Sequence, residues 1–185
     1  MRIGSQLGFA LLGLIHQQPM SGYDLRKIFT SAVMAGFSDS PGAIYPALAR
    51  LEASGLTRGN IQQSAGLRKR RVFHITPKGL AAFKAWLKKP VTRDDLIRRP
   101  GELMLRFAFM DGTLAEKWAI RFLREFAQEL HVYLQELKQY FESHAGDMPL
   151  SGRLALEYGI EEYAMRLHWA RTSAALYARR RRNKV

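Results

Sequence analysis

A run of four consecutive basic residues is the feature of this sequence that most directly suggests chemistry. The run consists of Arg68, Lys69, Arg70 and Arg71. It leads from residues 56–62 into residues 70–75, two short segments whose composition predicts strands joined by a turn. Cationic side chains on such a hairpin are suited to contact the phosphate oxygens of nucleic acid. In isolation a run of this kind is ordinarily a solvated loop, so its surroundings decide the interpretation.

A short helix just before this hairpin is expected to approach a DNA groove. Ile44, Leu48 and Leu51 recur at i, i+4 and i+7, which predicts one buried stripe. The helix is expected to begin just before Ile44, with Pro46 in its first turn, and to end at Gly55. The residues expected on the outward face are Ala43, Ala47, Arg50 and Ser54. Most of these are small and uncharged, which allows close approach, and a short helix followed by a basic hairpin is typical of a winged helix.

The residues predicted to contact DNA come from this helix, the turn before it and the helix that precedes both. They are Tyr23, Ser40, Gly42, Ala43, Tyr45, Ala47 and Arg50, together with the four basic residues of the hairpin. Tyr23 and Tyr45 stand near helix N-termini, whose backbone N–H groups favour anions, although burial in the core is the alternative for each. Arg50 is expected either to read a guanine edge or to pair with a phosphate or a carboxylate such as Glu52 or Asp39.

No pattern in the sequence predicts catalysis or metal binding. Its five histidines lack metal-ligand spacing, and it has no cysteine, no glycine-rich phosphate loop and no nucleophile motif. Adjacent carboxylates occur at Asp94-Asp95 and Glu161-Glu162, but neighbouring side chains on a helix point in different directions. We therefore predict that the protein is not an enzyme and holds no metal. The absence of cysteine is compatible with a reducing cytoplasm, where we expect the protein to act.

The elements that must position these residues can be expected from local signals. A first helix is expected over residues 4–17. Ser21 and Asp24 have the spacing of a capping box and open a second helix that should run to about residue 35. Thr76 is expected to cap a further helix after the hairpin. The predicted fold is mainly α with a small β-hairpin: an N-terminal winged helix-turn-helix, followed by a C-terminal helical dimerisation domain.

Several separate motifs, in the same order along the chain, resemble the PadR family of bacterial transcriptional regulators. The matching segments are residues 11–14, 19–25, 44–48, 50–52 and 75–79, and a weaker match covers residues 102–111. The resemblance extends over roughly residues 7–89, and the remainder is similar to the C-terminal helical domain of the larger PadR-type proteins. Two departures lie in the hairpin, where Leu67 replaces the usual arginine and Phe73 the usual tyrosine.

The resemblance implies a function as well as a fold. It implies a homodimeric transcriptional repressor that binds a two-fold operator in double-stranded DNA and responds to a small hydrophobic or phenolic effector, without a cofactor. Trp86, Trp118 and Trp169 are candidates to line an effector pocket, with core packing as the alternative for each.

The charge distribution divides the chain in the same way. Residues 1–89 hold 13 Lys and Arg residues against 3 Asp and Glu residues, whereas residues 90–177 hold 11 against 13. Residues 178–185 add five basic residues, which completes the formal net charge of +13. We therefore expect a DNA-binding domain over residues 1–89 and a helical dimerisation and effector domain over residues 90–185 with a basic tail.

The last helix is expected to form the dimer contact. A seam with alternating spacings of four and three residues predicts a packed helix pair. The seam residues are Leu156, Ile160, Tyr163, Leu167, Ala170 and Ala174. A second apolar stripe beside the seam consists of Leu154, Tyr158, Met165, Trp169 and Leu176, so this helix has more apolar surface than one neighbour can cover.

The main alternative is a basic interaction module that binds RNA or an anionic membrane surface. The basic residues are not arranged as an amphipathic helix, which favours DNA over a membrane surface. The apolar run at residues 7–15 is shorter than the roughly 20 residues needed to span a bilayer, so no membrane partner is expected. The tail at residues 179–184 remains open to three interpretations: DNA contact, a membrane surface, or fraying in solvent.

Overall fold

The structure is a computed structural model that describes residues 5–31, 41–63 and 69–182. The chain divides into two compact units, Met1–Lys88 and Lys89–Val185, and each is considered by itself. The described part is mostly helical with one small antiparallel sheet, as the sequence predicts.

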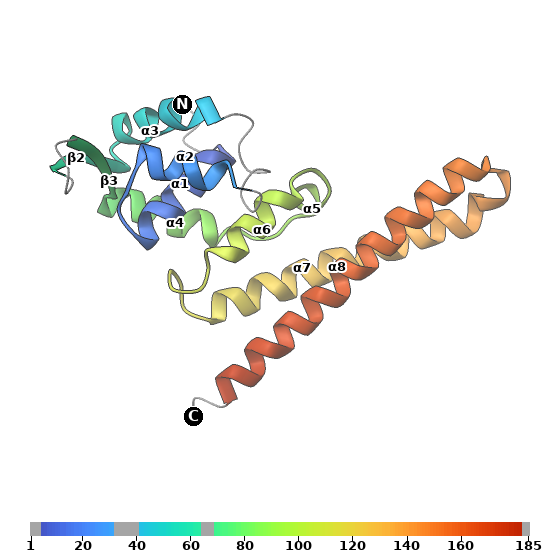
Figure 1. The fold of residues 1–185 in the computed structure, drawn as a ribbon. Helices are drawn as coiled ribbons and strands as arrows, with labels where there is room; N and C mark the ends of the chain where they lie inside the picture. The colour runs from blue at the N-terminus through green and yellow to red at the C-terminus, as the bar shows by residue number, and fades with distance from the viewer. Residues whose placement is uncertain (1–4, 32–40, 64–68, 183–185) are drawn as a thin grey trace. The chain divides into compact units, whose positions relative to one another are not determined.

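The N-terminal unit packs helices on a three-stranded sheet (Figure 1). Its elements are α1 (Gln6–Gln17), β1 (Met20–Ser21), α2 (Gly22–Phe29), a 3-10 turn (Pro41–Ala43), α3 (Ile44–Ala53), β2 (Thr57–Gln63), β3 (Lys69–Ile75) and α4 (Pro77–Leu87). The strand order is β1-β3-β2, and both pairings are antiparallel. The hairpin of β2 and β3, which we call the wing, was expected; β1 has only two residues and was missed.

Local capping signals account for most element boundaries in this unit. The Ser21 hydroxyl accepts from the backbone N–H of Asp24, and the Asp24 carboxylate accepts from that of Ser21, which confirms the capping box. Gly55 has φ +70° directly after the last turn of α3, a conformation that glycine adopts without strain. Helix α2 ends at Phe29, earlier than expected, because the hydroxyls of Thr30 and Ser31 bond to backbone carbonyls of its last turn. The glycine stop expected at residue 36 lies outside the described residues.

Aromatic stacking links α1 to α4 in the core of this unit. The rings of Phe9 and Trp86 are parallel, with centroids 4.5 Å apart, and Phe83 stacks on Trp86 at 5.9 Å. Trp86 is fully buried there, so core packing accounts for it rather than a pocket.

The C-terminal unit is built on a long antiparallel helical hairpin (Figure 1). Its elements are α5 (Arg93–Arg98), α6 (Pro100–Ala108), α7 (Lys117–His144), a 3-10 turn (Ala145–Asp147) and α8 (Leu150–Arg182). An aromatic cluster joins α6, α7 and α8, in which Phe107 stacks on Phe122 and meets Trp169 edge to face. The C-terminal half is therefore helical, as the sequence predicts.

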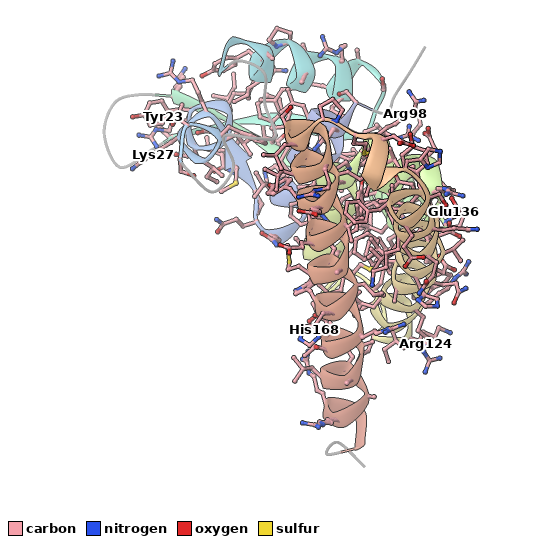
Figure 2. All side chains as sticks on the ribbon, turned by 90° about the vertical axis from the view of Figure 1, so that its right-hand side faces the viewer. Tyr23, Lys27, Arg98, Arg124, Glu136 and His168 are labelled. Atoms are coloured by element: carbon pink, nitrogen blue, oxygen red, sulfur yellow. The ribbon has the colours of Figure 1, made fainter. Side chains whose placement is uncertain are left out.

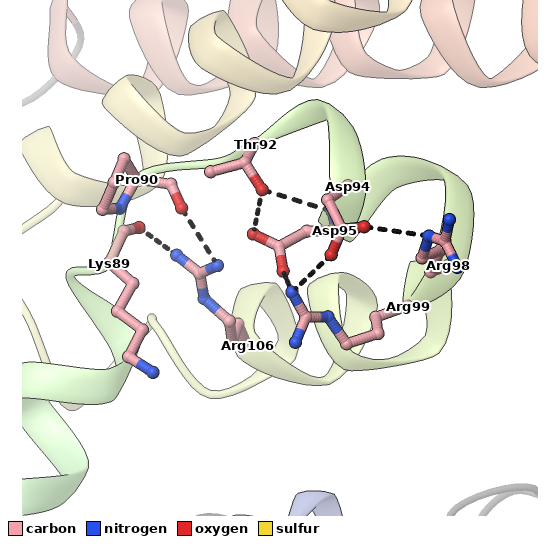
Figure 3. Close-up of polar contacts among 8 residues, drawn as sticks. All are labelled: Lys89, Pro90, Thr92, Asp94, Asp95, Arg98, Arg99 and Arg106. Atoms are coloured by element: carbon pink, nitrogen blue, oxygen red, sulfur yellow. Dashed lines mark hydrogen bonds and ion pairs between the residues drawn. The ribbon is translucent and has the colours of Figure 1, made fainter.

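The segment that leads into this unit is held by a buried arginine (Figure 3). Arg106 is 2% exposed and donates to the backbone carbonyls of Lys89 and Pro90. Its guanidinium lies over the Phe122 ring, 5.4 Å from the centroid. Burial lowers the pKa of Arg106, while nearby carboxylates, Asp95 first among them, oppose that shift. The main-chain carbonyls thus pair the two terminal nitrogens of a cation that would otherwise be costly to bury, while its Nε atom has no hydrogen-bond partner among the described residues.

Candidate nucleic-acid interface

Helix α3 presents one buried face and one exposed face. Ile44, Leu48 and Leu51 are buried, as the periodicity predicts. Ala47 is also buried, at 2% exposure, so its expected outward position is wrong. The reason is geometric: position i+3 lies on the same side of a helix as i and i+4. The residues exposed on this helix are Tyr45, Pro46, Ala49, Arg50 and Ala53.

Two tyrosines are exposed at the start of the helices. Tyr23 is 57% exposed and Tyr45 is 51% exposed, so core burial is excluded for both. Tyr23 projects from α2 into solvent together with Lys27, one turn further on (Figure 2). The Tyr45 ring lies against Gly22, where a Cβ atom would be 2.7 Å from Tyr45 Cε1. Gly22 therefore allows α3 to approach the N-terminus of α2.

A cleft of about 540 Å³ separates α3 from the wing. Its walls come from the N-terminus of α2, the outward side of α3 and strand β3, and they include Tyr23, Tyr45, Glu52, Arg70 and Arg71. We call this feature the α3–wing cleft. It combines hydroxyl groups, cations and one carboxylate on an open surface, which suits a polar, anionic partner.

The described wing cations differ in their contacts. Lys69 and Arg70 are exposed at the start of β3, where Lys69 is paired with Gln63 and Arg70 with Gln62. Arg71 instead points to α3, and its Nη2 atom donates to both Glu52 oxygens, at 2.9 Å and 2.8 Å. From the sequence we considered Glu52 only as a possible partner for Arg50. In the structure Glu52 forms its ion pair with Arg71 instead.

The comparison with a protein-family model concerns the N-terminal part of the chain. Residues 11–85 match the model of the transcriptional regulator PadR-like family. A PadR-like transcriptional regulator from Bacillus cereus is 32% identical over 43% of this chain and 75% of its own, with a TM-score of 0.37. Residues 11–85 of this chain thus belong to the transcriptional regulator PadR-like family.

Further solved PadR proteins match at lower identity. Bacillus subtilis PadR in complex with operator DNA is 21% identical, with 92% of this chain and 98% of that chain covered and a TM-score of 0.45. The same protein in complex with p-coumaric acid is 20% identical, with 94% and 96% covered and a TM-score of 0.42. The search of curated proteins found no match.

The predicted DNA-contacting residues of this PadR-like chain are only partly brought together. Tyr23, Tyr45, Arg70 and Arg71 line the α3–wing cleft, while Arg50 is exposed on α3 outside it. Gly42 and Ala43 lie in the turn that leads into α3. Ser40 and Arg68 fall outside the described residues. Sequence reasoning missed Gly22 and Gly59, whose roles depend on contacts with residues distant in the chain.

The predicted dimer seam packs within the chain. Leu167 and Ala170 are buried against α7, and Ile160, Tyr163 and Ala174 are partly buried in the same cluster, while Leu156 is half-buried. A spacing of four and three residues indicates a helix pair but does not say whether the partner helix lies in the same chain. On the opposite side of α8, four members of the second stripe are more than half exposed, namely Leu154, Tyr158, Met165 and Leu176, and so is Leu150. Trp169, the remaining member, is partly buried against the core.

Within the described ranges, no helix is long and apolar enough to cross a membrane. The same residues contain no group of three or more His, Cys, Asp and Glu side chains placed to hold a metal ion.

Proposed function

We propose that this PadR-like regulator binds double-stranded operator DNA through α3 and the wing. The α3–wing cleft carries the proposal, because exposed tyrosines and cations line a groove beside the exposed face of α3. In this arrangement α3 enters the major groove and the wing contacts the neighbouring backbone, so the sugar–phosphate strand between them lies in the cleft. We place this activity in the cytoplasm, as a repressor.

Selection from a pool of random duplexes tests this function. We expect enrichment of a two-fold symmetric sequence, with half-sites separated by about one helical turn or a multiple of it. A parallel titration with single-stranded RNA and with anionic vesicles covers the alternative of a basic interaction module. Preference for either of these over duplex DNA, or no enriched duplex, would contradict the proposal.

Arg50 is proposed to read a base. It is exposed on α3, and Glu52, the described carboxylate that the sequence suggested as its partner, is bound to Arg71. Arg50→Ala should therefore cost about 1–3 kcal/mol at one base position of the selected site and relax the preference there. Titrations against single-base variants of the site measure this effect. Equal weakening on every variant would show instead that Arg50 contacts a phosphate.

The exposed stripe on α8 is proposed to join two copies into a homodimer. Apolar side chains aligned on one face, each more than half exposed, are expected to be covered by a partner. Leu154→Asp combined with Tyr158→Asp should give monomers in sedimentation equilibrium, because burial of unpaired carboxylates is unfavourable. Both residues are exposed within the chain, so the hairpin itself should keep its helical circular dichroism. A dimer of unchanged affinity would show that the dimer contact lies elsewhere on the chain.

A cavity of about 360 Å³ in the C-terminal unit is the proposed effector site. Met104, Phe126 and Trp169 contribute apolar walls, and Arg166, which is ion-paired with Glu162, adds a cation that an acid would have to share. Such a site suits a small aromatic acid, and p-coumaric acid, with which Bacillus subtilis PadR has been solved, is the natural probe.

Tryptophan emission reports on this site. Saturable quenching by p-coumaric acid is expected in the wild type and should be largely lost in Trp169→Phe, since Trp169 lines the cavity. Trp118→Phe is the matched control, because that ring contacts Arg121 and is not part of the cavity wall. Quenching that survives in Trp169→Phe would place the ligand at another site.

A further inference from the structure

A single carboxylate organises the cationic side of the α3–wing cleft. Residues 1–88 contain only three acidic residues, Asp24, Asp39 and Glu52, against a large excess of Lys and Arg. Asp24 caps α2, and Asp39 lies outside the described residues. Glu52 is therefore the one described carboxylate that faces the wing.

Glu52 holds the wing at two points. Its Oε1 atom accepts from the backbone N–H of Gly59 on β2, at 2.8 Å, and from Arg71 on β3. The Arg71 guanidinium also lies over the ring of the buried Phe73, 5.6 Å from its centroid. These contacts attach both strands of the wing to the last turn of α3.

Gly59 leaves the room that this contact requires. A Cβ atom at position 59 would lie 2.5 Å from Arg71 Nε and 3.1 Å from Glu52 Oε1. Any other residue would displace the guanidinium or the carboxylate. Three residues from α3, β2 and β3 are thus matched to one another, which is more than a chance surface ion pair.

We propose that Glu52 determines the specificity of DNA binding by withholding Arg71 from phosphate and by fixing the position of the wing on α3. An arginine free to reach phosphates adds affinity for every sequence alike, because phosphate contacts carry no base information. Glu52 limits that sequence-independent contribution, so discrimination depends more on the outward face of α3. This inference rests on the proposed DNA-binding function.

Glu52→Gln tests the proposal directly. The amide oxygen still accepts from Gly59, while the charge that holds Arg71 is removed. We expect tighter binding to random duplex, by roughly eight-fold for each Arg71 that reaches a phosphate at 0.1 M salt, and a salt slope steeper by about 0.9 per contact. The affinity ratio between operator and random duplex should fall. Unchanged random-duplex affinity and slope, or equal weakening on both duplexes, would overturn the proposal.

Two further variants exclude the alternative that Arg71 leaves Glu52 for a phosphate when DNA binds. If Arg71 is withheld, Arg71→Gln should leave the salt slope unchanged, and the double variant Glu52→Gln/Arg71→Gln should match the wild-type slope and affinity within a few-fold. If Arg71 changes partner, both variants lose about 0.9 in slope per contact, which refutes the proposal.

A charge control and a folding control complete the design. Glu136→Gln, on α7 of the other unit (Figure 2), makes the same charge change and removes an ion pair with Arg93 of α5, so it should not alter the slope. A similar change in that variant would assign the effect to net charge and overturn the proposal. Thermal unfolding of each variant checks the fold, and a wild type without salt-dependent duplex binding would refute the proposed function itself.

Discussion

Gly79→Ala should cause a large loss of stability in the N-terminal unit. A Cβ atom at this position would lie 2.0 Å from the carbonyl oxygen of Leu56 and 2.9 Å from its carbonyl carbon. Both are backbone atoms, and the same oxygen accepts from the backbone N–H of Thr76 at 3.0 Å. Relief of the clash must therefore move α4 away from the start of the wing.

The expected cost is about 3 kcal/mol, at the upper end for an overpacked site. For a unit of this size the melting temperature should fall by roughly 12–24 °C. Circular dichroism with Trp86 emission as a local probe measures the change, since Trp86 lies in the core of the same unit.

Gly159→Ala is the matched control in α8. No atom lies within 4 Å of the position that its Cβ would occupy, and glycine within a helix is weaker than alanine by roughly 0.5–1 kcal/mol. The same substitution should therefore stabilise the hairpin of α7 and α8. Equal effects at the two glycines would show that the close approach of α4 to Leu56 is not what matters.

Removal of the two exposed wing cations should have the largest effect on DNA affinity. Lys69→Ala combined with Arg70→Ala removes two exposed cations that have no ion pair among the described residues. Binding to operator and to random duplex should weaken by the same factor, roughly eight-fold per lost phosphate contact at 0.1 M salt, and the salt slope should fall by about 0.9 per contact.

Fluorescence anisotropy at several salt concentrations measures both quantities. Arg124→Ala combined with Lys138→Ala removes the same charge from exposed positions on α7, and it should leave the slope unchanged. A loss confined to the operator would mean that the wing reads bases, contrary to this account.

Local sequence signals predicted the framework of the fold. The capping box at Ser21, the cap at Thr76 and the glycine after α3 each depend on a few neighbouring residues, so the sequence defines them directly. The predicted end of α2 was wrong, because the hydroxyls of Thr30 and Ser31 donate to backbone carbonyls at the end of this helix. Composition alone does not determine whether a hydroxyl makes such a bond.

Contacts between distant segments could not be predicted. We predicted a phosphate contact for Arg71 because nothing in the sequence distinguishes the four cations of the run. In the structure Glu52, 19 residues away, forms an ion pair with Arg71. Similarly, the seam of α8 predicts a packed helix but not whether its partner is α7 or a second chain. In both cases the missing information is which surfaces meet in three dimensions.

Hydroxyl-radical footprinting of protein side chains, with and without saturating operator duplex, tests the central claim most directly. Tyr23 and Tyr45 are exposed at the α3–wing cleft, and Tyr140 on α7, which is 51% exposed, serves as an internal control. Binding through the cleft predicts that oxidation of Tyr23 and Tyr45 falls on addition of DNA while that of Tyr140 is unchanged. Undiminished oxidation of both cleft tyrosines in the saturated complex would contradict the proposal that α3 and the wing bind DNA.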